Sequence, residues 1–198
     1  MKTEYELRVL EIEPKSIISL LEELGANKIV NFEQKRYVYN LNPAQDGKWI
    51  RLRTNGRKTT LTYKDIVSNT IDGTKEIEVE VSDFEATNEL LEKMGYFNNG
   101  YQENKRIQYE LNNVEIDIDS WPLIPSYLEI EGQSEKEVTD MLKLLNLREE
   151  KVTALNCSDI YKKIYCIDID KIKMLKFNEE KLAKLRTFDD VLQEKYGE

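Results

Sequence analysis

The segment Glu4-Tyr5-Glu6-Leu7-Arg8 alternates charged and apolar residues near the start of the chain. Successive side chains of a β-strand point to opposite faces, so its three charged residues share one face. The pattern returns at Glu76-Ile77-Glu78-Val79-Glu80 and, in shorter form, at Glu129-Ile130-Glu131. Each copy precedes a segment with a helical pattern. A strand face that carries paired carboxylates three times over either meets solvent or encloses something positively charged.

Composition limits the classes of function that this chain of 198 residues can have. It is long enough for one large domain with a sizeable core. A net charge of −9 argues against general binding of nucleic acid or anionic membranes. The absence of histidine removes His-based nucleophile activation and His–metal sites. Any metal would therefore be held by oxygen, which favours Mg²⁺, Mn²⁺ or Ca²⁺.

The sequence also gives expectations about the cellular compartment. The N-terminus lacks the apolar region of a signal peptide, and no segment approaches the length of a membrane span. Cys157 and Cys166 are interpreted as two reduced packing thiols. We therefore expect a cytoplasmic protein.

The order of the predicted elements indicates one α+β domain. Asn55-Gly56 and Asn112-Asn113 are typical of two-residue hairpin turns between strands. Many hairpin-linked strands with few helices favour an antiparallel sheet or a closed barrel. No Pro- or Ser-rich linker divides the chain, so we expect a domain at 1–166 with a helical extension at 167–198. Strands are predicted at 3–10, 34–41, 48–54, 58–66, 74–82, 103–111, 114–120 and 126–131. Helices are predicted at 14–24, 83–94 and 134–147, followed by a helical tail from Thr153 with breaks near 167–170 and at Thr187.

The two turns also predict which residues face one another. The later hairpin should place Arg106 opposite Asp119, with one face wholly apolar and the other wholly polar. The earlier hairpin should place Arg53 opposite Lys58. Like charges directly opposite each other are unfavourable unless a counter-charge is near.

Two arrangements explain these polar faces. In the first, an antiparallel sheet turns its polar face to water and covers its apolar face with helices. In the second, the sheet closes into a barrel with a polar, charged lumen and with the helices packed outside. Enclosed charges without partners are costly, so such a lumen should bind divalent cations at its carboxylates and a polyanion at its Arg and Lys side chains. The strand positions that would line it are Glu4, Glu6, Arg8, Arg51, Arg53, Lys64, Glu76, Glu78, Arg106, Asp119, Glu129 and Glu131.

Taken together, these motifs resemble the CYTH superfamily, the triphosphate tunnel metalloenzymes, over residues 2–161. Six elements occur in the family's order, which is a specific signal. They are Glu4-x-Glu6-x-Arg8, which resembles the family's E-x-E-x-K, then Arg51-Leu52-Arg53, the strand of Lys64, Glu76-x-Glu78, Lys105-Arg106, and Asp119 followed by Glu129-x-Glu131.

The resemblance implies a closed eight-stranded antiparallel tunnel that binds a small triphosphate with Mg²⁺ or Mn²⁺. The implied metal ligands are Glu4, Glu6, Glu129 and Glu131, with Asp119, Glu76 and Glu78 as further or indirect ligands. The implied phosphate-binding residues are Arg8, Arg51, Arg53, Lys64 and Arg106. Glu4, Glu6 and Arg8 are the implied catalytic residues.

Two departures from the family pattern affect this interpretation. Arg8 replaces the usual Lys, and Arg does not act as a base near neutral pH, so phosphate binding suits this position better than proton abstraction. Trp121-Pro122-x-x-Pro125 replaces the glycine-containing connection of many members, so the local bend must differ.

The resemblance implies more than one activity. The leading hypothesis is metal-dependent hydrolysis of inorganic tripolyphosphate or of an organic triphosphate such as thiamine triphosphate. The alternatives are a class IV adenylyl cyclase and a non-catalytic protein that binds triphosphate or nucleotide. In each case the partner is a small molecule, and a homodimer is a further expectation.

Overall fold

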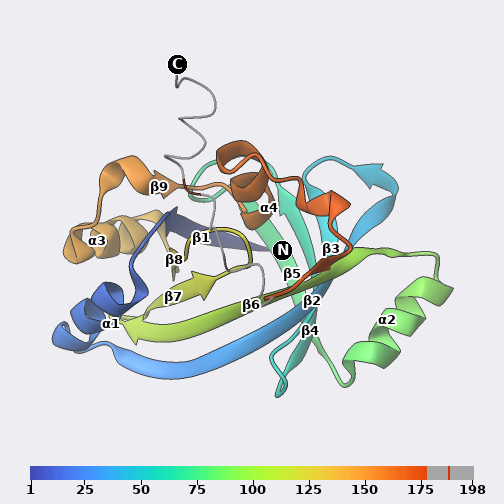
Figure 1. Ribbon diagram of the computed structural model, residues 1–198, viewed down its shortest axis with the longest axis horizontal. Coiled ribbons are helices and arrows are strands. Elements are labelled where there is room, and N and C mark those ends of the chain that lie inside the picture. The colour runs from blue at the N-terminus through green and yellow to red at the C-terminus, as the bar shows by residue number, and fades with distance from the viewer. Residues whose placement is uncertain (178–186, 188–198) are drawn as a thin grey trace.

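Eight strands close into an antiparallel barrel, which confirms the predicted fold class (Figure 1). The computed structural model describes residues 1–177 and Thr187. Its strands are β1 (Lys2–Val9), β2 (Asn27–Gln45), β3 (Lys48–Thr54), β4 (Thr59–Ile66), β5 (Thr74–Val81), β6 (Asn98–Leu111), β7 (Val114–Ser120), β8 (Tyr127–Gly132), β9 (Val152–Thr153) and β10 (Met174–Leu175). The ring runs β6-β2-β3-β4-β5-β1-β8-β7, and β7 pairs with β6 to close it. Of the two short strands, β9 pairs with β1, and β10 runs parallel to β6.

Helices pack on the outside of the barrel. They are α1 (Pro14–Glu23), α2 (Phe84–Lys93), α3 (Glu135–Leu145) and the short α4 (Cys157–Asp159). Side-chain caps stabilise the first turns of two of them: Asp83 accepts a hydrogen bond from the backbone N–H of Ala86, and Ser134 accepts one from that of Glu137. No helix in the described part of the chain is long and apolar enough to cross a membrane.

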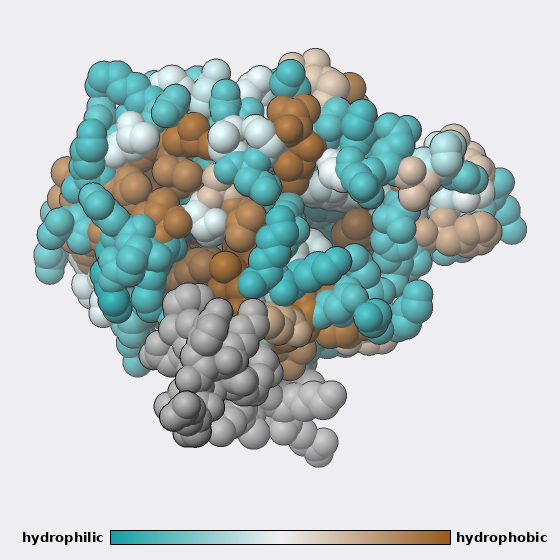
Figure 2. Space-filling model, turned by 90° about the horizontal axis from the view of Figure 1, so that it is seen from above, coloured by the Kyte–Doolittle hydropathy of each residue, from teal (hydrophilic) through white to brown (hydrophobic). Residues whose placement is uncertain are grey.

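The main apolar core lies between the barrel wall and the helices α1 and α3. Ile17 and Leu21 of α1 and Met141 of α3 pack on the outer faces of β1, β6, β7 and β8. The alternation of these four strands therefore places apolar side chains outward under the helices and charged side chains inward. On the face seen in Figure 2, hydrophilic residues dominate and apolar residues lie between them in separate patches.

A second apolar core holds the C-terminal segment, which we define as residues 154–177, against the barrel. Ile160, Tyr161 and Ile169 pack with Trp121 and Tyr127. This segment is only partly helical: α4 continues into a π-helical turn, η2 (Ile160–Ile164), and a 3₁₀ turn, η3 (Ile169–Lys171), precedes β10. The predicted helical tail is thus wrong for much of this segment. The remainder of the predicted extension, apart from Thr187, lies outside the described residues.

Two strands are much longer than the sequence predicts. The prediction gave 34–41 and 103–111, whereas β2 and β6 begin at Asn27 and Asn98. They pair with each other from Asn27 opposite Glu110 to Tyr39 opposite Asn98. Gly100 lies in this extension of β6. A larger residue would be crowded there, because its Cβ would lie 2.9 Å from the backbone oxygen of Ile172 in the C-terminal segment.

One predicted hairpin register is confirmed and the other is wrong. Arg106 lies opposite Asp119, and Asn112 and Asn113 both have positive φ, as a tight two-residue turn requires. In the earlier hairpin, the loop spans four residues, so Arg53 faces Thr60 and not Lys58.

A side-chain cap explains the longer loop. The Asn55 side-chain oxygen accepts hydrogen bonds from the backbone N–H groups of Arg57 and Lys58. The shift is by two residues, so the same side chains still face the lumen. The like-charge pair that the sequence predicted at this hairpin does not form.

Candidate functional site

The barrel encloses a cavity of about 800 Å³ that every predicted site residue lines. The structure therefore brings together side chains from seven strands that are far apart in the sequence. Their roles as ligands remain predictions. The predicted residues on the cavity surface are Glu4, Glu6, Arg8, Arg51, Arg53, Lys64, Glu76, Glu78, Arg106, Asp119, Glu129 and Glu131.

One side of the cavity, formed by β1, β7 and β8, is rich in carboxylates, and we call it the carboxylate wall. Its members are Glu4, Glu6, Asp119, Glu129 and Glu131, and Asp117 lies beside them on the same face of β7. Arg8 lies within it, with Nη2 2.9 Å from Glu6 and 2.6 Å from Glu129. Nη1 donates to the backbone oxygen of Leu155. Burial alone would lower the pKa of Arg8, but Glu129 and Glu6 outweigh it and hold the pKa well above its ordinary value.

Arg106 has an even denser set of acidic partners. It contacts Asp117, Asp119 and Glu129 at 2.5–2.9 Å. Burial would raise the pKa of Glu129, but Arg8 and Arg106 hold it far below its ordinary value. Glu129 is therefore already neutralised by two guanidinium groups.

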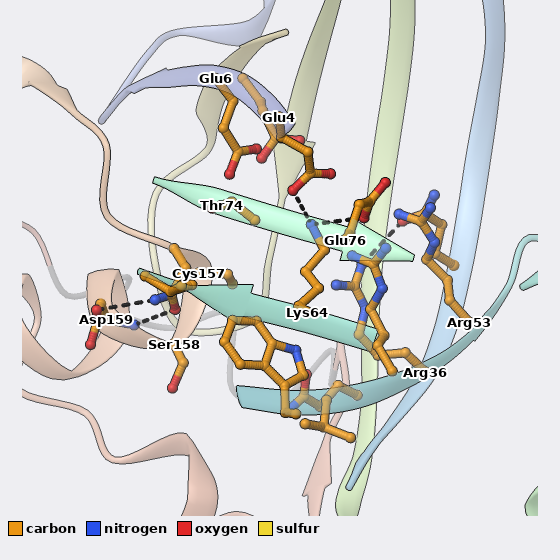
Figure 3. A pocket seen from close by; sticks show the side chains of 18 of the residues that line it. Glu4, Glu6, Arg36, Arg53, Lys64, Thr74, Glu76, Cys157, Ser158 and Asp159 are labelled. Atoms are coloured by element: carbon orange, nitrogen blue, oxygen red, sulfur yellow. Dashed lines mark hydrogen bonds and ion pairs between the residues drawn. The ribbon is translucent and has the colours of Figure 1, made fainter. Parts of the chain in front are cut away.

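Lys64 contacts carboxylates at the end of the carboxylate wall nearest β5 (Figure 3). Its Nζ lies 2.7 Å from Glu4 and 3.4 Å from Glu76. One amine between two carboxylates leaves negative charge in excess. The Oε2 atom of Glu76 is buried and accepts no hydrogen bond from any described residue.

The same excess appears at Glu131. Burial, together with the negative charges of Glu4 and Glu129, raises the pKa of Glu131 to about 7. Burial also raises the pKa of Glu4, although Lys64 opposes this shift. This corner of the wall favours binding of a proton or another cation.

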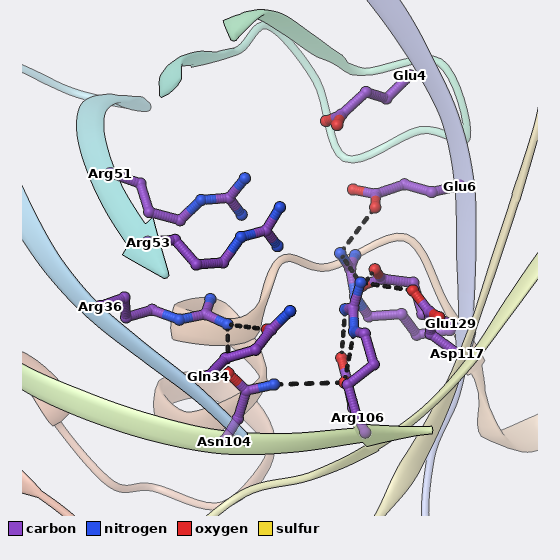
Figure 4. A network of polar contacts seen from close by, with 12 residues as sticks. Glu4, Glu6, Gln34, Arg36, Arg51, Arg53, Asn104, Arg106, Asp117 and Glu129 are labelled. Atoms are coloured by element: carbon purple, nitrogen blue, oxygen red, sulfur yellow. Dashed lines mark hydrogen bonds and ion pairs between the residues drawn. The ribbon is translucent and has the colours of Figure 1, made fainter. Parts of the chain in front are cut away.

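The opposite side of the cavity is formed by β2 and β3 and carries Arg36, Arg51 and Arg53, which we call the guanidinium wall. Arg51 and Arg53 share one carboxylate, Glu78, at 3.5 and 3.7 Å. The charge of Arg51, followed by burial, lowers the pKa of Arg53 to about 9. Figure 4 shows the three side chains in a row that faces the carboxylates of β1 and β8. This wall has the charge to bind a polyanion.

The carboxylate wall has the donor chemistry for a hard divalent cation. Glu4, Glu6 and Glu131 offer oxygen atoms on adjoining strands, with Glu6 directly opposite Glu131. Among the described residues, no three acidic or cysteine side chains lie close enough as they stand to hold a metal ion. Each of the three carboxylates is paired with a different cation: Glu4 with Lys64, Glu6 with Arg8 and Glu131 with Lys2. Charge and donor type fit a metal, and Glu129 fits less well because of its two Arg partners.

Sequence reasoning missed Arg36, which lines the cavity from β2 at one end of the guanidinium wall. It also missed Asp117 on β7, which binds Arg106. Gln34, Arg36 and Val38 occupy alternate positions of the predicted strand 34–41 and all line the cavity, but nothing in the sequence places Arg36 beside Arg51 and Arg53. Asp117 could have been found from the hairpin register, which places its side chain on the same face as that of Asp119.

Fold and cavity together define a class: closed antiparallel barrels whose lumen carries opposed acidic and basic walls. The family model of the CYTH domain matches residues 2–156, and the chain belongs to this family. No curated protein matches the chain.

Several solved structures share the fold. A protein of Pyrococcus horikoshii OT3 matches with a TM-score of 0.68 and 28% identity, over 77% of this chain and 96% of that one. A putative adenylate cyclase from Vibrio parahaemolyticus matches with a TM-score of 0.70 and 14% identity, over 81% and 98%. A putative adenylyl cyclase from Hippeastrum, described as having a dominant triphosphatase activity, matches with a TM-score of 0.54 and 15% identity, over 82% and 94%.

Proposed function

We propose that this protein hydrolyses a small triphosphate, inorganic or organic, with the help of Mg²⁺ or Mn²⁺. The observation that carries the proposal is the opposition of the two walls in one cavity. Negative charge is in excess at Glu4 and Glu131, and positive charge is in excess at the guanidinium wall. A triphosphate that chelates a divalent cation matches both. The triphosphatase activity of the Hippeastrum relative is consistent with this choice.

The guanidinium wall would bind the phosphate chain. Arg51 and Arg53 present planar donor groups that suit phosphate oxygens, and Glu78 is their one shared counter-charge among the described residues. Hydrolysis forms a bond from a water oxygen to one phosphorus atom and breaks the bridging P–O bond of that phosphorus. The leaving phosphate or pyrophosphate gains negative charge, which Arg51 and Arg53 stabilise.

Glu4, Glu6 and Glu131 would hold the metal. When bound, a divalent cation would neutralise phosphate charge and help to orient the attacking water. The proton of that water needs an acceptor, and Arg8 is unsuited because Glu129 and Glu6 hold its pKa well above its ordinary value. A carboxylate of the carboxylate wall is therefore the group that would accept the proton of the water. Arg8 instead fixes Glu6 and Glu129 in place.

The test compares three substrates. The protein is incubated with Mg²⁺ or Mn²⁺ and, separately, tripolyphosphate, thiamine triphosphate and ATP, and phosphate, pyrophosphate and cyclic AMP are measured. We expect phosphate release that EDTA abolishes. Cyclic AMP as the main product would identify a cyclase instead. Tight triphosphate binding without turnover would identify a non-catalytic binding protein.

A variant pair tests the metal ligands. Glu6→Gln should lower metal-dependent turnover at least 100-fold while the circular dichroism spectrum is unchanged. Glu80→Gln is the matched control, because Glu80 pairs with Lys58 and its side chain is 67% exposed. Full activity of Glu6→Gln would refute the assignment.

A further inference from the structure

Arg36 is a buried cation of the lumen whose hydrogen-bond partners are neutral and do not balance its positive charge. Only 7% of the residue is exposed, a value close to the 5% of Arg8. Its Nη2 atom donates to the side-chain oxygens of Gln34 at 3.1 Å and Asn104 at 2.5 Å. Both acceptors are neutral amides. No carboxylate of the described residues lies within ion-pair distance of Arg36.

Trp121 fixes the position of this guanidinium. The guanidinium carbon of Arg36 lies 4.5 Å from the centre of the indole ring. Tyr161 packs against the same indole in a T-shaped arrangement, with the ring centres 6.2 Å apart. Trp121 thus packs between Arg36 and the C-terminal segment, and this contact gives a structural role to the Trp–Pro connection that departs from the family pattern.

Two buried donors of this stacked pair have no acceptor among the described residues. They are Nε of Arg36 and the indole Nε1 of Trp121. A buried N–H group without a partner costs free energy, and so does a buried charge without a counter-charge. Burial and the charge of Arg51 lower the pKa of Arg36 to about 10. The site therefore calls for an anion that is rich in acceptors.

The location of the pair identifies which part of a ligand would reach it. Arg36 continues the row of Arg51 and Arg53 (Figure 4). Beyond it, Cys157 and Ile169 of the C-terminal segment line the cavity. The row of guanidinium groups therefore ends at Arg36, where a linear anion would place its end.

We propose that Arg36, stacked on Trp121, binds the terminal phosphoryl group of the triphosphate and thereby selects triphosphates over diphosphates. This inference rests on the proposed function. A terminal phosphoryl group has three non-bridging oxygens and takes a second negative charge near pH 6, so it matches both the unpaired charge and the unpaired donors. Inorganic tripolyphosphate and an organic triphosphate both present such a group.

The experiment measures dissociation constants by calorimetry, in EDTA so that no turnover occurs, for tripolyphosphate, ATP and pyrophosphate. In Arg36→Gln we expect affinity for tripolyphosphate to fall at least tenfold and affinity for pyrophosphate to change less than twofold. Equal affinities of the wild type for tripolyphosphate and ATP would support recognition of the triphosphate chain that both ligands share, with no contribution from the nucleoside. A loss confined to tripolyphosphate would identify the inorganic chain as the ligand, and a loss confined to ATP the organic one.

Controls separate this inference from the proposed function. Arg57→Gln, in the exposed hairpin loop, should bind like the wild type. Arg36→Lys should recover part of the affinity, and Trp121→Phe, which keeps the ring but removes the N–H group, should lose a few-fold. Unchanged binding in a folded Arg36→Gln, or an equal loss for all three ligands, would overturn the role of Arg36 alone. A wild-type protein that binds no triphosphate in EDTA and hydrolyses none with Mg²⁺ or Mn²⁺ would overturn both.

Discussion

The two walls of the lumen bury guanidinium groups to a similar degree but give them different partners. Arg106 meets three carboxylates, whereas Arg36 meets two neutral amides and an indole ring. Removing one member of a buried ion-pair network leaves uncompensated charge, whereas removing a charge that has no counter-charge does not. The difference indicates that Arg106 holds the barrel together and that Arg36 is available to a ligand.

The sharpest test of this contrast is the effect of the same substitution on stability. Arg106→Gln should lower the free energy of unfolding by about 3–5 kcal/mol, because Asp117, Asp119 and Glu129 lose a shared partner. Arg36→Gln should change it by less than about 1 kcal/mol, since no carboxylate is left unpaired. Urea unfolding followed by circular dichroism measures both. Similar losses in the two variants would break the comparison.

A ligand should stabilise the protein through the guanidinium wall. Tripolyphosphate at 100 times its dissociation constant should raise the free energy of unfolding by about 2.7 kcal/mol, if it binds only the folded state. Arg53→Gln should remove most of this gain at the same concentration. Thermal unfolding with and without tripolyphosphate measures the effect, with sodium chloride of equal ionic strength as the control. A gain that survives in Arg53→Gln would place the anion elsewhere.

Glu78 separates two interpretations of the site. If Glu78 is a metal ligand, its removal should abolish turnover. Its contacts with Arg51 and Arg53, together with the hydrogen bond it accepts from Thr62 at 2.7 Å, point to a counter-ion of the guanidinium wall. We therefore expect Glu78→Gln to bind tripolyphosphate a few-fold more tightly in EDTA. Calorimetry gives the affinity, and a phosphate-release assay shows whether turnover remains.

Strict alternation and a tight turn predicted the later hairpin register. They left an open sheet and a closed barrel both possible, and the closed barrel followed from the resemblance to the CYTH superfamily. The sequence could not give the earlier register, since the Asn55 side chain stabilises a longer loop than Asn-Gly usually forms. Arg36 was missed for a different reason. A single Arg on an alternating strand has no companion in the sequence, and only the closed barrel places it beside Arg51 and Arg53. A homodimer and a cytoplasmic location remain predictions.

The smallest expected effect concerns a thiol of the C-terminal segment that lines the cavity beyond Arg36. Burial raises the pKa of Cys157 to about 12, although the charge of Arg36 opposes the shift. The thiolate is the reactive form, so in a Cys166→Ser variant the alkylation of Cys157 should be slow at pH 8 and rise about tenfold per pH unit up to pH 10. Mass spectrometry after iodoacetamide treatment measures the rate, with urea-unfolded protein as the fully reactive reference. Arg36→Gln should slow the reaction further, because it removes a positive charge that favours the thiolate; faster alkylation would instead show that Arg36 mainly holds the C-terminal segment closed over the cavity.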